Sequence, residues 1–416
     1  MSSTASAPAF TQKEILKHGP FRVLWLAQFV SIFGDFLALF GVIALITFRW
    51  QGTAVQVTAV SIAYVAPLAL LSPVAGVFVD HWNVKRVMII SDLVRALLIV
   101  LLLFVSDARQ IYVIFFVLST VSSFFTPAQS VALRTIVPAE GLLAANGLMT
   151  QAFFIVRLIS PFAAGSVIAA LGEKTCFYLD TASFAFSAIM ISTLAIVRPA
   201  RADSEKTVAS LTRDFLDGNK FIFTHVGLSF VFMAMALATL VLSSFSPLIS
   251  IYIRDSLHAG PFTFGVVSAM VGIGLMSGAQ ALPHISRGLS RINVVLSGLL
   301  ALGLGAALLG TFRNIPVAAL SMFFIGFAIS FVLITAQTMS QQETPPNMVA
   351  RVSGSFMSLM QMGNVLGLLL SGVLAQKLGV RQLFLTSAGM MVVIVLAGYW
   401  FMRGKSHDTP AKTQAS

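Results

Sequence analysis

Long apolar stretches follow one another along this 416-residue chain, and each could cross a lipid bilayer as a helix of about 20 residues. Only 10% of the residues are charged, against roughly 25% in soluble domains. A surface with so few charges must face lipid, where only helices and closed barrels satisfy the backbone hydrogen bonds. The stretches lack the two-residue alternation of barrel strands. We therefore predict an all-α membrane protein with twelve transmembrane helices, at residues 22–46, 55–79, 87–105, 111–133, 146–171, 176–197, 225–252, 262–283, 292–312, 315–338, 354–377 and 382–402.

The longest polar break, residues 198–224, divides the spans into two sets of six. Within it Leu211, Phe215 and Ile222 fall on one helix face, which predicts a short amphipathic helix on the inner membrane surface. A weak internal repeat also precedes the fifth and eleventh spans. The predicted regions are an N-terminal tail (1–20), a six-helix bundle (21–197), a linker (198–224), a second six-helix bundle (225–403) and a C-terminal tail (404–416).

Lysine and arginine residues are distributed unequally between the predicted loops. With both termini inside, the inner segments hold 17 of them and the outer segments hold 7. Positive charge collects on the cytoplasmic side of membranes, so the bias predicts cytoplasmic termini in a bacterial inner membrane. It also accounts for the net charge of +11 without a nucleic-acid partner. The expected surroundings are the lipid bilayer, and we expect a monomer.

Two ionisable side chains, Asp35 and Arg157, fall deep inside predicted spans of the first half. A charge in the membrane core is unfavourable, so it usually faces a cavity or a partner. Both residues lie roughly 17–20 Å from the inner ends of their spans, counted at about 1.5 Å per residue. We therefore predict that they are neighbours, with Asp35 accepting a proton or another cation while Arg157 tunes its affinity. The alternatives are a fixed structural ion pair and an Asp35 that reaches the outer interface.

Three more charges lie nearer the ends of the predicted spans. Asp180 is one turn into span six, where an interface or capping role is expected rather than ion coupling. Asp92 and Arg95 are three residues apart near the inner end of span three, a spacing that predicts an ion pair on the helix surface. This pair would belong to a gating network or simply to the membrane interface.

Polar amides are the remaining candidates inside the spans. Hydrogen bonding between helices is their default role, and lining a large apolar pocket for amphipathic substrates is the alternative. The candidates for such a substrate cavity are Gln28, Gln337, Gln361 and Asn364.

Several kinds of chemistry are not indicated. The chain has no glycine-rich phosphate loop followed by Lys-Ser or Lys-Thr, so ATP is not the expected energy source. The six histidines are scattered, and the single Cys176 excludes an intramolecular disulfide. We therefore expect no metal site, no cofactor and no enzymatic activity.

The connection between the second and third spans carries a motif, GVFVDHWNVKR, from Gly76 to Arg86. It resembles the cytoplasmic loop signature of the major facilitator superfamily, with His and Asn where Arg and Gly are usual. The resemblance implies two six-helix halves and a loop that gates transport. In that superfamily the signature Asp lies against the N-terminus of span eleven, so Asp80 would latch the halves together near Gly354. The gating residues would be Gly76, Asp80, His81, Lys85, Arg86, Asp92 and Arg95.

Residues 125–146 and 177–184 are similar to a narrower group of bacterial drug exporters, with macrolide-efflux, siderophore-export and lysophospholipid-transfer members. This resemblance implies a secondary exporter of small amphipathic compounds, of multidrug or macrolide type, that works by proton antiport and alternating access. One alternative is a dedicated exporter or flippase of an endogenous product such as a siderophore or a lysophospholipid. Another is a membrane sensor or scaffold that transports nothing.

Overall fold

The computed structural model confirms the all-α prediction. Across the part of the chain that it describes, helices alternate with short connections and no strand occurs. Twelve of these helices are long and apolar enough to cross a membrane, which is the predicted number. The described residues are 10–79, 81–196, 219–345 and 348–403.

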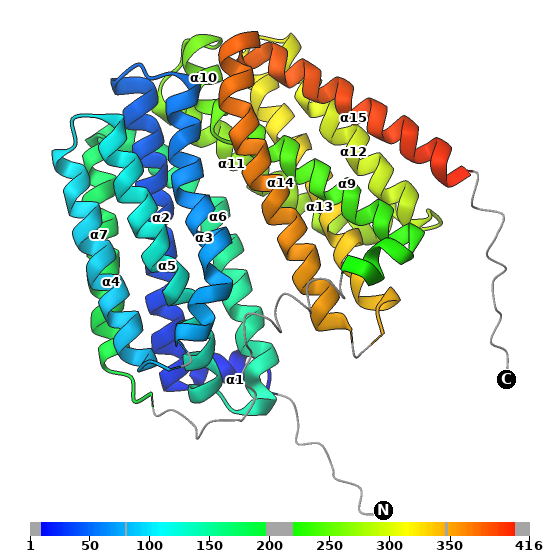
Figure 1. The fold of residues 1–416 in the computed structure, drawn as a ribbon. Coiled ribbons are helices and arrows are strands. Elements are labelled where there is room, and N and C mark those ends of the chain that lie inside the picture. Colours follow the sequence, from blue (N-terminus) through cyan, green and yellow to red (C-terminus); the bar gives the residue numbers. More distant parts are fainter. Residues whose placement is uncertain (1–9, 80, 197–218, 346–347, 404–416) are drawn as a thin grey trace, which may run out of the picture.

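The twelve long helices form two groups of six that lie side by side (Figure 1). The first half contains α2 (Gly19–Ala44), which a π-helical turn η1 (Leu45–Arg49) extends, and then α3 (Ala54–Val79), α4 (Val84–Leu101), α5 (Ala108–Ile136), α6 (Leu142–Leu171) and α7 (Glu173–Ser192). The second half contains α9 (Val226–Phe245), α11 (Pro261–Ile285), α12 (Arg291–Thr311), α13 (Ile315–Glu343), α14 (Val349–Leu378) and α15 (Val380–Arg403).

The internal repeat is visible in the fifth helix of each half. Helices α6 and α14 each have 30 residues. Each is followed by a glycine in the left-handed region, Gly172 at φ 84° and Gly379 at φ 86°. Glycine adopts this conformation without steric cost, so both helices end through the same kind of C-terminal cap.

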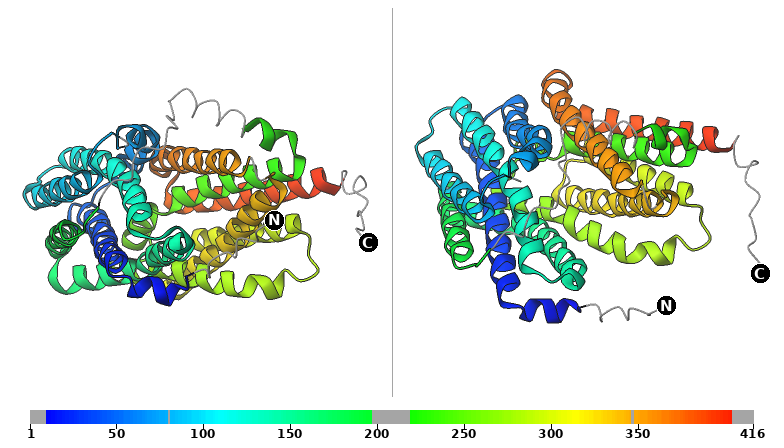
Figure 2. Two further views of the ribbon diagram at one scale, coloured as in Figure 1. Left: turned by 90° about the horizontal axis from the view of Figure 1, so that it is seen from below. Right: turned by 60° about the horizontal axis from the view of Figure 1, so that its bottom comes forward.

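Two predicted boundaries were wrong. The seventh span, predicted over 225–252, stops at Phe245, and a separate short helix α10 (Leu248–Asp255) follows it. Pro247 lies between them, where it has no backbone N–H to continue the helix. The predicted N-terminal tail contains a helix, α1 (Gln12–Lys17), which begins with a capping box between Thr11 and Glu14. The buried Ile15 anchors α1, which crosses the end of the bundle (Figure 2).

The predicted linker lies mostly outside the described residues, which resume at residue 219. Residues 219–224 are helical, and Ile222 is fully buried. Leu211 and Phe215, the other two residues of the predicted amphipathic face, lie outside the described residues, so the surface helix stays a prediction.

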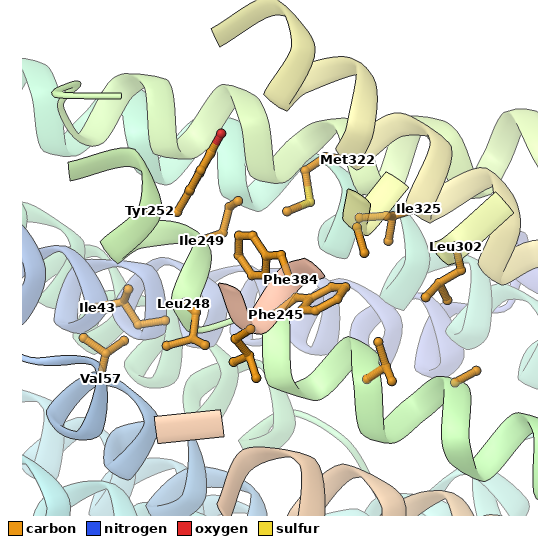
Figure 3. Packing of buried hydrophobic residues seen from close by; sticks show 14 of the residues in the cluster. Ile43, Val57, Phe245, Leu248, Ile249, Tyr252, Leu302, Met322, Ile325 and Phe384 are labelled. Carbon is orange, nitrogen blue, oxygen red and sulfur yellow. The ribbon is translucent and has the colours of Figure 1, made fainter. Parts of the chain in front are cut away.

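The two halves approach at one end of the bundle and diverge toward the other end (Figure 1). We name the first the contact end; it contains η1 and α10, and α1 lies at the opposite end. At the contact end the Thr47 and Ser250 hydroxyls are 3.0 Å apart, and Arg254 donates to the Thr47 and Gly52 carbonyls at 2.8 Å each. One buried apolar cluster continues across both halves there. Figure 3 shows Ile43 and Val57 beside Leu248.

Glycines also bring the halves together between α6 and α11, starting near the contact end, where Gly265 lies in the first turns of α11. A Cβ on Gly265 would lie 2.5 Å from the Pro161 carbonyl oxygen and 2.7 Å from the Gly165 Cα. Ordinary van der Waals contacts of a Cβ are 3.4–4 Å. Only glycine therefore permits this backbone approach, and Gly272 packs against Leu158 in the same way about two turns further along α11.

Candidate functional site

A cluster of four charged side chains lies inside the first half, and we name it the charge cluster. It consists of Asp35 on α2, Asp92 and Arg95 on α4, and Asp180 on α7. Asp92, Arg95 and Asp180 are buried, whereas the Asp35 side chain keeps 17% of its surface accessible. The cluster holds three carboxyl groups and one guanidinium group, so the cation cannot neutralise all three acids.

Arg95 is the centre of the charge cluster. Its guanidinium group forms an ion pair with Asp92 one turn earlier on α4, and its Nη1 lies 3.8 Å from Oδ2 of Asp35. The same group lies over two aromatic rings, 4.5 Å from the Phe125 centroid and 4.4 Å from the Phe184 centroid. These cation–π contacts stabilise a charge that has left water, and they fix the guanidinium between α5 and α7.

Asp180 makes one side-chain hydrogen bond. Its Oδ1 accepts from the Ser183 hydroxyl at 3.1 Å, and its buried Oδ2 has no hydrogen-bond partner among the residues that the structure describes. The carboxyl group rests on Gly34 of α2, where a Cβ would overlap both Asp180 and Ser183. Glycine at this position therefore lets the acid of α7 approach Asp35, the next residue of α2, closely enough for strong electrostatic interaction.

Two hydroxyl groups border the charge cluster. Ser187, on α7, is fully buried, and its hydroxyl faces the Asp92 carboxyl. Tyr64, on α3, lies close enough to Asp35 to interact with it electrostatically. The cluster is thus enclosed by α2, α3, α4, α5 and α7, and Asp35 is its most accessible acid.

The predicted partnership of Asp35 with Arg157 was wrong, because Asp35 faces Arg95 instead. The reason lies in the faces of α2. Phe36, the next residue of α2, faces α6, with its ring 6.2 Å from that of Phe153. Asp35 points about 100° away from Phe36 around the helix, toward α4. Arg157 forms no hydrogen bond or ion pair with any residue that the structure describes.

Two other expectations also change. The ion pair of Asp92 with Arg95 is present as predicted, but it is buried inside the first half and not on a helix surface. Asp180 is fully buried in the charge cluster and not at the membrane interface. Sequence spacing alone could not reveal either result, because both depend on how α2, α4 and α7 pack. The available signal was that an acid in an apolar span needs a partner.

The predicted gating loop connects α3 with α4. Gly76 lies in the last turn of α3, and the His81 ring is 2.9 Å from the Val77 carbonyl. Asn83, which occupies the place of the usual glycine, caps α4 by accepting from the Arg86 backbone N–H at 3.0 Å. Lys85 and Arg86 lie in the first turn of α4, and Arg86 is exposed. Asp80, the predicted latch, lies outside the described residues.

The four amide candidates for a substrate cavity lie in different surroundings. Gln28 is buried in the first half, and its Nε2 has no hydrogen-bond partner among the described residues. Gln361 and Asn364 are half-buried near the middle of α14, and Gln337 is exposed on α13. Gln361 and Asn364 lie on the same side of α14 as Gly372, which packs against Thr58 of α3. This face of α14 is therefore directed toward the first half.

Comparison with known proteins places these features in a family. The sequence model of the Major Facilitator Superfamily matches residues 24–367 and 231–416. The multidrug efflux pump Tap of Mycolicibacterium fortuitum is 25% identical over 413 residues, covering 95% of this chain and 99% of the pump. Macrolide efflux protein A of Streptococcus pyogenes is 22% identical over 388 residues, covering 90% and 94%. An uncharacterized MFS-type transporter of Bacillus subtilis, YfiS, is 27% identical over 381 residues, covering 90% and 91%.

Solved structures show the same fold at lower identity. The nucleoside transporter NupG superimposes with a TM-score of 0.74 at 17% identity, covering 92% of this chain and 99% of NupG. A bacterial homologue of the lysosomal transporter Spinster gives 0.71 at 11% identity, covering 92% and 98%.

Twelve membrane-spanning helices in two repeated halves, with charges buried inside one half, define a polytopic membrane transporter. The chain belongs to the Major Facilitator Superfamily. Its members move small molecules across membranes, and its relatives at 22–25% identity include drug and macrolide efflux proteins.

Proposed function

We propose that this protein is a secondary exporter of small amphipathic compounds in a bacterial inner membrane, driven by proton antiport. The observation that carries the proposal is the charge cluster, in which three carboxyl groups share one guanidinium group inside an apolar bundle. The efflux activity named for Tap and for macrolide efflux protein A supports the direction of transport. A dedicated exporter of an endogenous amphiphile is the alternative.

The excess of acid over base in the charge cluster argues for proton binding. An ionised carboxylate inside a membrane protein is strongly unfavourable unless it has a partner. Arg95 can balance one of the three negative charges, and it already pairs with Asp92. The remaining acids, Asp35 and Asp180, therefore take up protons when the cluster is shut off from water. We therefore assign a proton to the cluster.

Proton exchange with water would occur at Asp35, because its side chain is the most accessible of the cluster. A proton lost from Asp35 leaves a negative charge 3.8 Å from a guanidinium nitrogen, which strengthens that ion pair. The stronger ion pair between Asp35 and Arg95 would hold α2 against α4. Protonation would weaken the same contact, so the proton would control how tightly α2 is held within the first half. A proton-driven exporter needs such a link between protonation and the packing of its helices.

The lysine and arginine bias supports a cytoplasmic location for α1 and for the end of the bundle where α1 lies. The contact end would then be the outer side. The arrangement described here would be the one in which the outer side is closed, and transport would require the halves to separate there and to approach on the inner side. This is the alternating-access mechanism, with the substrate held between the halves.

Flux in proteoliposomes tests the proposal. With an imposed pH gradient, the purified full-length protein should move aromatic amphiphiles uphill. Asp35→Asn should abolish this gradient-driven movement but should keep exchange of substrate at equal pH, because the substrate site lies between the halves. Asp107→Asn is the matched control, since Asp107 caps α5 far from the charge cluster and Asn caps equally well. Equal gradient-driven flux in Asp35→Asn and the wild type would overturn proton coupling through Asp35.

A further inference from the structure

Arg157 lies on the face of α6 that is directed between the halves. Near the middle of this 30-residue helix, its neighbours Phe153 and Leu158 both face other helices. Phe153 meets Phe36 of α2, and Leu158 packs against Gly272 of α11. Measured around the axis of α6 at 100° per residue, Arg157 lies about 40° from Phe153 and about 100° from Leu158, between these two positions. Its side chain therefore projects between α2 of the first half and α11 of the second half, and it is exposed.

No charge of the described chain balances Arg157. It forms no ion pair or hydrogen bond there, and no described carboxylate lies near enough to act on it electrostatically. The acids of the charge cluster are turned toward Arg95 inside the first half. The membrane cores of the six long helices of the second half contain no Asp or Glu. An unpaired cation at this depth is unfavourable, which favours a ligand of opposite charge.

The face of α6 that carries Arg157 is amphipathic along its length. Asn146 and Thr150 are exposed and lie within about 20° of Arg157 around the helix, closer to the end that contains α1. Phe153 and Phe154 border the same face, and each keeps 39% of its surface exposed. A polar row that leads to a guanidinium group, with aromatic rings beside it, matches a molecule with an anionic group and an apolar body.

We propose that Arg157 binds the anionic group of the transported compound, so that the substrates are anionic amphiphiles carrying a carboxylate, sulfonate or phosphate. The guanidinium group binds the oxyanion through charged hydrogen bonds, and Phe153 and Phe154 contact the apolar part. This inference rests on the proposed function, because it names the class of substrate that the exporter carries. It also separates the roles of the two arginines: Arg95 serves the proton site, and Arg157 serves the substrate.

Two probes that differ by one group test the proposal. They are 8-anilinonaphthalene-1-sulfonate and N-phenyl-1-naphthylamine, which share the aromatic body and differ by the sulfonate. Binding of each is titrated by fluorescence to the full-length protein in phosphatidylcholine nanodiscs, with empty nanodiscs as the blank. The variants are Arg157→Gln, Arg157→Lys and, as the control, Arg109→Gln, which changes an exposed arginine in the first turn of α5.

Arg157→Gln should weaken binding of the sulfonate about ten- to hundredfold, the usual effect of losing a hydrogen bond to a charged group, and should change binding of the neutral probe less than about twofold. Arg157→Lys should retain most of the sulfonate affinity, and Arg109→Gln should match the wild type. An unchanged sulfonate affinity in Arg157→Gln, or an equal loss for both probes, would overturn the anion site.

Flux of the neutral probe in proteoliposomes distinguishes the two proposals. The inference predicts that Arg157→Gln reduces gradient-driven flux of the sulfonate and leaves the flux of the neutral probe at its wild-type rate. A wild-type protein that binds the sulfonate through Arg157 but moves neither probe would overturn the exporter and leave the anion site standing. A wild-type protein that moves both probes, with an Arg157→Gln variant that also moves both equally, would overturn the anion site and leave the exporter standing.

Discussion

Adding one methyl group to Gly265 should open the contact end. The new Cβ would lie 2.5 Å from the Pro161 oxygen and 2.7 Å from the Gly165 Cα, so α6 and α11 must separate by about 0.7–0.9 Å to reach 3.4 Å. Overpacking of this kind costs about 1–3 kcal/mol. Only the arrangement with a closed contact end bears this cost. Gly265→Ala should therefore shift the population toward an open contact end by about 5- to 150-fold, at about 1.4 kcal/mol per factor of ten.

A buried reporter makes this shift measurable. Ser250 is fully buried at the contact end, and Cys176 is the only native cysteine. In a Cys176→Ala background, the Ser250→Cys thiol should react faster with a maleimide in nanodiscs when Gly265→Ala is also present. Gly260→Ala is the control, because a Cβ there meets nothing within 4 Å. Equal labelling rates in the Gly265→Ala and Gly260→Ala proteins would refute the argument that this glycine contact holds the end closed.

Three further substitutions test other parts of the structure. Gly34→Ala should displace the Asp180 carboxyl and reduce gradient-driven flux at least about tenfold, whereas Gly19→Ala, which has open space around it, should not; proteoliposome flux decides. Arg95→Lys should lower the free energy of unfolding by about 2 kcal/mol, because an ammonium group loses the planar stacking between two rings, and a lower thermal midpoint would show it. Tyr252→Phe should cost about 1 kcal/mol in the same assay, since its hydroxyl donates at 2.8 Å to the backbone carbonyl that ends α12. Unchanged midpoints would contradict both assignments.

Most of the fold follows from the sequence because the membrane imposes one simple rule. A span of about 20 apolar residues must be a helix, so counting such stretches gives the number of helices. The rule does not predict whether a helix continues through a proline or ends there. Helix α5 continues through Pro127 and α6 continues through Pro161, but the chain breaks at Pro247. Hydropathy cannot distinguish a continuous helix from a broken one at proline. The difference depends on which neighbouring groups donate hydrogen bonds to the backbone carbonyl that proline leaves without a partner.

The charge cluster shows what sequence reasoning can and cannot reach. Asp35 was identifiable as a functional candidate, because an acid deep in a span is energetically unfavourable and usually has a partner or a function. Its partner was not identifiable, since only helix packing decides whether Arg95 or Arg157 faces Asp35. Asp180 joins the cluster because Gly34 has no side chain. That contact links two helices almost 150 residues apart in the chain, and no local pattern records it.

Proton movement driven by substrate alone tests the central proposal most directly. Proteoliposomes are loaded with an aromatic amphiphile and a pH-sensitive dye, the membrane potential is clamped, and the outside is diluted at equal pH. Proton antiport predicts that the lumen acidifies as the amphiphile leaves, and that Asp35→Asn abolishes the acidification while Asp107→Asn preserves it. Amphiphile that leaves wild-type vesicles through the protein with no change in luminal pH would contradict proton coupling by the charge cluster.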